Sequence, residues 1–196
     1  LKGLQAISVD RPNGKPGMAL VGAKGNPANL SNLAFGQLAD TIKAPKGYLS
    51  TLSANTAAAA INEGIASLTD DEELRQFLFC QNEDEPLFVR ALNSRTYGRI
   101  WNESIVSSLI NRFGNGVDGD WKVPGEFGKD VKITKANTTL FAGDRDMFVF
   151  LADEKNRIEL PNRRNGETGS LARGFFVGNS EVGEGKLYVA SFYFDY

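Results

Sequence analysis

Apolar residues recur at helical spacing between residues 31 and 68 and change to strand-like runs after residue 86. The first helical stretch begins after Ser31, which can cap a helix, and ends before Pro45. Its apolar side consists of Leu33, Phe35, Leu38 and Ile42. A second helix is expected from Asn55 through a row of alanines, which lets another element pack closely. Its apolar stripe consists of Ile61, Ile65 and Leu68.

A third helix is expected after Thr69 or Asp70, either of which can cap it. The residues expected to face the core are Leu74, Phe77 and Leu78. Acidic residues in a first helical turn are favoured by the helix dipole. The cluster Asp71, Glu72 and Glu73 therefore indicates a helix start rather than a metal site.

The second half of the chain predicts strands around one helix. Residues 87–92 are apolar enough for a strand, and residues 102–113 have a helical pattern that Gly114 ends. The helix residues expected to be buried are Ile105, Val106, Leu109 and Ile110. After a loop over 114–130, further strand-like runs are 131–141, 147–154, 174–178 and 186–194. The last run is apolar at both alternating sets of positions, which indicates that most of its aromatic residues lie in a core.

These elements predict an α+β fold, with N-terminal helices packed on a mainly antiparallel, twisted sheet that has long hairpins. Residues 1–29 are rich in proline and glycine and are interpreted as an extended arm with one short strand at most. The expected division is this arm, a helical part over 30–85 and a sheet part over 86–196, together forming one compact unit. The chain begins at Leu1 and stops at Tyr196 within an apolar run, so we expect a truncated C-terminus.

The composition of the chain excludes several classes of function. The 196 residues are 41% hydrophobic and 23% charged, as in globular proteins, and the net charge of -2 provides no global basic field for nucleic acid. The absence of histidine excludes serine-histidine and cysteine-histidine dyads and histidine-ligated metals. The single cysteine, Cys80, lies in an apolar run and is interpreted as a buried structural thiol. No intrachain disulfide is possible, and no stretch has the length of a membrane span or the pattern of a signal peptide.

Three motifs resemble one known family. Residues 33–39 and 44–49 are similar to an AFGQL and APxxYL opening, residues 89–97 to a RALLSDRY strand, and residues 175–187 to a loop containing SNSEVG. Asn93, Ser94 and Thr96 are small departures from the second motif. The chain thus resembles proteins of domain of unknown function 932 (DUF932) over residues 30–196. The resemblance implies a phage or plasmid context but no particular activity. With a single cysteine, a reducing cytosolic compartment fits best, which in that context is the cytoplasm of a bacterial host cell; a cysteine-poor secreted protein is the alternative.

Arginines alternate with aromatic residues in the last third of the chain. Guanidinium groups can hold phosphates, and aromatic rings can stack on bases, so this region is a candidate for binding single-stranded nucleic acid. The candidate phosphate contacts are Arg157, Arg163, Arg164, Arg173 and Lys186, and the candidate stacking residues are Tyr188 and Tyr193. The alternative is that the aromatic residues form the buried side of strands and the arginines a solvated face.

Two other functions stay open. Glu184 and Lys186 have the spacing of an acid-x-Lys pair in magnesium-dependent nucleases, and further oxygen ligands could come from Asp144, Asp146 and Glu181. Aspartates are also common in a glycine-led turn without any metal. The loop 178–183 could bind an anion or simply form a tight hairpin. Strands that are apolar on both sides favour self-association, which fits a structural or host-interaction (counter-defence) protein.

The favoured hypothesis is a non-enzymatic, homo-oligomeric recombination-type module that binds single strands. It requires no catalytic residue, metal or cofactor. It has no membrane partner, and a host protein is the alternative partner.

Overall fold

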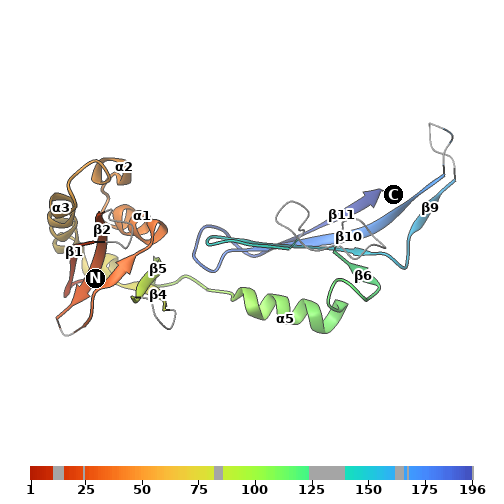
Figure 1. The fold of residues 1–196 in the computed structure, drawn as a ribbon, viewed down its shortest axis with the longest axis horizontal. Helices are drawn as coiled ribbons and strands as arrows, with labels where there is room; N and C mark the ends of the chain where they lie inside the picture. The colour runs from red at the N-terminus through yellow and green to blue at the C-terminus, as the bar shows by residue number, and fades with distance from the viewer. Residues whose placement is uncertain are drawn as a thin grey trace. The chain divides into compact units, whose positions relative to one another are not determined.

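The computed structural model describes residues 1–10, 16–23, 25–81, 86–123, 140–161, 166 and 168–195. The chain has an α+β fold, as predicted, and forms two compact units, Leu1–Tyr97 and Gly98–Tyr196 (Figure 1). The division lies after Tyr97, whereas the sequence suggested boundaries at residues 29 and 85. None of the helices in the described part of the chain is long and apolar enough to cross a membrane.

The N-terminal unit contains its own five-stranded sheet, in the order β1-β2-β3-β5-β4. The strands are β1 (Leu4–Asp10), β2 (Pro16–Gly22), β3 (Ala28–Leu30), β4 (Arg75–Cys80) and β5 (Phe88–Ser94). Only β3 and β5 pair in parallel. The expected arm over residues 1–29 is therefore wrong. Ala6 of β1 and the run Met18, Ala19 and Leu20 of β2 are buried, and the two strands pair along their whole length, so this segment forms part of the sheet and its core.

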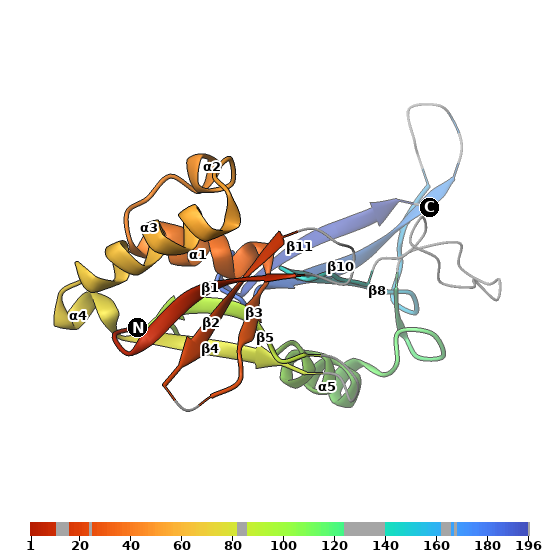
Figure 2. The same cartoon turned by 60° about the vertical axis from the view of Figure 1, so that its left-hand side comes forward.

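Helices cover one side of this sheet, as Figure 2 shows for α1 and α3. The helices are α1 (Asn32–Thr41), α2 (Lys46–Leu49) and α3 (Ala54–Ala66), and the two predicted helices correspond to α1 and α3. Ser31 caps α1 as expected, because its Oγ accepts a hydrogen bond from the amide of Ala34. The core between helices and sheet includes Leu38 and Ile61, both fully buried. The N-terminal helices thus pack on a sheet of their own unit.

The third predicted helix is only one turn long, α4 (Asp70–Glu73), and the chain then continues as β4. Glu72 accepts hydrogen bonds from Lys43 and Thr69, which lower the pKa of its carboxyl to about 2 and complete a capping box. The helix-start interpretation of this acidic residue is confirmed. The predicted helix is wrong here, because Phe77 to Phe79 favour a strand and pair with β5. Of the three expected core residues, Leu78 is buried and Phe77 packs on the core, but Leu74 is exposed. Cys80 ends this strand and is half-buried.

The second sheet belongs to the C-terminal unit and is antiparallel throughout, in the order β11-β10-β8-β6. Its strands are β6 (Trp121–Lys122), β7 (Leu140–Ala142), β8 (Met147–Asp153), β9 (Ile158–Leu160), β10 (Gly169–Asn179) and β11 (Tyr188–Asp195). Short β7 pairs with β8, and β9 pairs with β10. The strands predicted around β8, β10 and β11 are confirmed. Most of the strand predicted over 131–141 lies outside the described residues.

Helix α5 (Asn102–Phe113) has the predicted bounds and ends at Gly114, whose positive φ of 85° suits glycine. Its apolar stripe, Ile105, Val106, Leu109 and Phe113, packs on Met147, Val149 and Leu151 of β8. Ile110 was expected to be buried but is 50% exposed. The other three residues expected to be buried, Ile105, Val106 and Leu109, are only half-buried, because a single helix on a sheet leaves much of its surface to solvent.

Candidate nucleic-acid interface

The strand register gives the C-terminal sheet two faces. Residues directly opposite each other in antiparallel strands share a face. Leu151, Phe175 and Ser191 lie opposite one another and belong to the helix face, on which α5 packs. Phe150, Phe176 and Ala190 belong to the other face. We call this the aromatic face and define it by Phe148, Phe150, Phe176, Tyr188 and Phe192.

The rings of the aromatic face contact one another across three strands. Phe150 of β8 stacks on Phe176 of β10, with centroids 5.1 Å apart and planes at 18°. Tyr188 of β11 meets Phe176 edge-on at 5.8 Å, and Phe192 lies 6.1 Å from Phe150. Among the described residues, the unit's one helix, α5, packs on the opposite face. The aromatic face is therefore a half-buried layer of rings that no described helix covers.

Two glycines of β10 fix the position of the β11 rings. Gly178 lies opposite Tyr188 and Gly174 opposite Phe192. A Cβ atom added at either glycine would collide with the ring of its partner. Each ring therefore lies over bare backbone, close to the strand, with its other side directed away from the sheet. Tyr188 is still 39% exposed. Such a ring presents a flat π surface that a base could stack on.

Few cations accompany these rings. Lys122 lies opposite Ala152, which faces the same side as Phe150, so Lys122 belongs to the aromatic face. Lys186, a predicted phosphate contact, is exposed in the turn that leads into β11 and thus lies close in sequence to Tyr188. Two ammonium groups can hold phosphates but provide a weak electrostatic field.

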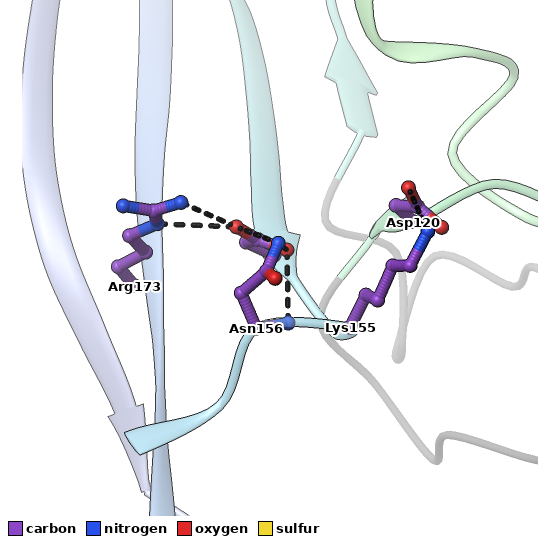
Figure 3. Close-up of polar contacts among 5 residues, drawn as sticks. Asp120, Lys155, Asn156 and Arg173 are labelled. Carbon is purple, nitrogen blue, oxygen red and sulfur yellow. Dashed lines mark hydrogen bonds and ion pairs between the residues drawn. The ribbon is translucent and has the colours of Figure 1, made fainter.

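Arg173 and Tyr193 lie together, but on the helix face. They are directly opposite each other in β10 and β11, and their side chains are 61% and 66% exposed. Arg173 donates from Nε and Nη2 to Oδ2 of Asp153, at 3.1 and 3.0 Å (Figure 3). The ion pair neutralises Arg173 locally and fixes its guanidinium group.

Asp153 is the buried anchor of this polar group, since its side chain is only 1% exposed. Besides Arg173, the backbone and side-chain amides of Asn156 donate to it at 3.2, 3.0 and 3.1 Å. Burial acts to raise the pKa of the Asp153 carboxyl, but the hydrogen bonds from Asn156 and Arg173 outweigh it. Its pKa therefore lies below the ordinary value. A buried carboxylate with this many donors stays charged and ties β8 to β10.

The remaining predicted phosphate contacts are Arg157, Arg163 and Arg164. Arg157 forms an ion pair with Glu154. Arg163 and Arg164 lie outside the described residues, and their role stays a prediction. The predicted set therefore does not form one surface. Tyr188 and Arg173 lie on opposite faces of the sheet, and Lys186 lies in a turn.

The acidic residues of the nuclease hypothesis have other partners. Glu184 lies 3.7 Å from Arg145, and buried Glu181 accepts a hydrogen bond from the amide of Asn102 at 3.1 Å. Within the described ranges, no group of three acidic or cysteine side chains could hold a metal ion.

The loop that follows β10 anchors helix α5. Asn179 donates to the carbonyl of Ile100 and to the side chain of Asn102, at 2.9 and 2.8 Å. The carboxylate of Glu181 accepts from the first helical amide, and Arg99 donates to the carbonyl of Glu181 at 2.8 Å. Glu181 thus occupies the place at the helix start that an external anion would take. This arrangement indicates that the loop positions helix α5 and is not an anion-binding site.

Sequence reasoning missed Phe148 and Phe150 as part of the candidate surface. The signal was present, because phenylalanines alternate in β8 and two glycines four residues apart follow in β10.

Comparison with protein-family models, curated proteins and solved structures finds no match to this chain.

Proposed function

We propose that the C-terminal unit binds single-stranded nucleic acid without cleaving it, and that bases stack on the aromatic face. The observation that carries the proposal is the position of Tyr188 and Phe192, each held over a glycine with one ring side directed outward. Single strands fit this surface because their bases are free to stack, whereas the bases of a duplex are not.

Stacking rather than charge would provide most of the affinity. Stacking on an aromatic side chain contributes about 1–3 kcal/mol per base and tolerates any sequence. Lys122 and Lys186 would contact about two phosphates, so the logarithm of the binding constant should fall with the logarithm of salt with a slope of about −1.4. Arg173 would contribute little, because Asp153 already pairs with it.

The test is fluorescence anisotropy of a labelled single-stranded oligonucleotide titrated with protein over a range of salt. The double variant Tyr188→Leu with Phe192→Leu keeps apolar bulk over the glycines and removes the π surface. We expect it to bind about thirtyfold or more weakly, since two stacking contacts are lost. The matched control is Tyr193→Leu, an exposed tyrosine of the same strand on the helix face, which should bind like the wild type.

Two results would contradict the proposal. A loss of binding in Tyr193→Leu with none in the double variant would move the site to the Arg173 surface. Absence of binding by the wild type at low salt would remove nucleic acid as the partner and favour the host-interaction alternative. A gel of the oligonucleotide after incubation with Mg²⁺ should show it intact. The phage or plasmid context implied by the resemblance to DUF932 stays a prediction.

A further inference from the structure

Strand β11 is the outer strand of the C-terminal sheet. Among the described strands it pairs only with β10, so its second row of backbone groups has no described strand beside it. Residues 188–194 contain no charge and no proline. Val189 and Tyr193 are 65% and 66% exposed, the highest values among the large apolar side chains described. A long, apolar, uncharged edge of this kind readily pairs with another strand.

At one edge of the N-terminal sheet, by contrast, a side chain hydrogen-bonds to the backbone of the outer strand. There, the side chain of Asn62 in α3 accepts from the amide of Ala6 at 2.7 Å and donates to its carbonyl at 3.0 Å. The Asn62 amide thus takes the place of a neighbouring strand at the outer strand β1.

We propose that β11 pairs antiparallel with β11 of a second copy of this chain, about a two-fold axis at Ser191. In this register, Ser191 lies opposite its own copy, and Val189 lies opposite Tyr193 of the second copy. Pairing of a β-branched with an aromatic residue is favourable across strands. All residues from 188 to 194 then face uncharged residues, so both copies contribute the same self-complementary edge.

Neighbouring registers fit less well. Antiparallel partners must share a face, so the axis can move only from one residue to the next, which shifts each pairing by two positions. An axis at Phe192 places Val189 opposite the carboxylate of Asp195. An axis at Ala190 places Lys186 opposite Phe194. The axis at Ser191 alone pairs the two most exposed apolar side chains and keeps charges at the ends.

The dimer would join the C-terminal sheets of the two copies edge to edge, so that the aromatic face continues from one copy to the other. Phe192 of one copy would lie opposite Ala190 of the second. The inference does not depend on nucleic acid, since it concerns the edge of β11 rather than the rings, and it is tested without any ligand.

The experiment is sedimentation velocity of the wild type, Ser191→Lys, Ser191→Glu and an equal mixture of the two variants. Ser191 is exposed, so both substitutions should leave the fold intact, and circular dichroism checks this. Like charges opposite each other at the axis oppose pairing, whereas opposite charges favour it. We expect a wild-type dimer, a monomer for each variant alone and a heterodimer in the mixture. The control Ser191→Thr should remain dimeric.

A second variant keeps the test valid if a charged strand fails to fold. Ser191→Cys combined with Cys80→Ser carries one thiol at the axis, and mild oxidation should produce a disulfide-linked dimer. A monomeric wild type at the highest soluble concentration would overturn the proposal. A dimer that persists in both charged variants and does not cross-link through residue 191 would also overturn it.

Discussion

The two faces of the C-terminal sheet are built from the same strands but differ in composition and cover. On the helix face, aliphatic Met147, Val149 and Leu151 are buried beneath α5. On the other face, the alternate positions carry rings that contact one another and stay partly exposed. Strand alternation therefore lets one sheet combine a core with a candidate binding surface. The helix face should determine stability, and the aromatic face should determine binding.

The largest difference is expected between one residue of each face. Leu151→Ala should destabilise the unit by about 2–5 kcal/mol, because it leaves a cavity under α5. Tyr188→Ala should cost about 1 kcal/mol of folding or less, since that ring is partly exposed. Urea unfolding followed by tryptophan fluorescence measures this, because both tryptophans, Trp101 and Trp121, lie in the C-terminal unit. Equal losses of unfolding free energy in Leu151→Ala and Tyr188→Ala would contradict the distinction between the two faces.

A smaller effect is expected at the buried anchor Asp153. Asp153→Asn should cost about 1–3 kcal/mol, because Arg173 loses its charged acceptor and a buried polar group is left poorly paired. The matched control is Asp120→Asn, whose ion pair with Lys155 is exposed and should contribute about 0–1 kcal/mol. A control as destabilised as Asp153→Asn would show that burial does not strengthen the anchor.

The same carboxyl should make stability depend on pH. Its pKa is lower in the folded chain than the ordinary value of 3.8, so its stabilising contribution is fully present above that value. The contribution is lost as pH falls through the lower folded pKa. The difference in unfolding free energy between the wild type and Asp153→Asn should therefore shrink as the pH is lowered below 3.8. A difference that grows on acidification would contradict this sign.

The smallest effect is expected at the start of helix α5. Glu181→Ala removes the acceptor for the first amide of α5 and should cost about 0.5–2 kcal/mol, as the loss of a helix cap does. The control is Glu184→Ala, an exposed residue of the same loop, which should change stability little. Hydrogen exchange of the α5 amides reports this locally, and exchange unchanged by Glu181→Ala would exclude the anchoring role.

Local signals predicted some elements well. Ser31 and Ser53 cap α1 and α3, Gly114 ends α5, and all three helices have apolar stripes. Strands β8, β10 and β11 are long apolar runs, so short-range patterns sufficed for these elements. The N-terminal strands were missed because this segment is rich in proline and glycine, and its strands are defined by the pairing of β1 with β2 rather than by a local pattern. Phe77 to Phe79 fit a helix or a strand, and pairing with β5, the next strand along the chain, decided between them.

The sequence predicted only part of the candidate site. The sequence named Tyr188, Tyr193 and Arg173 but could not assign them to faces, because that requires the register of β10 with β11 and β8. Neither could it show that Asp153, twenty residues away, pairs with Arg173. Long-range partners decide which charges are available for binding, and periodicity contains no information about them.

The most direct test of the central claim is photo-crosslinking of a bromouracil-containing single strand to the wild-type protein, followed by mass spectrometry of the linked peptides. The account predicts cross-links to aromatic-face residues of β8, β10 and β11, above all Tyr188 and Phe192. Cross-links confined to the N-terminal unit, or to Tyr193 and α5 on the helix face, would contradict it.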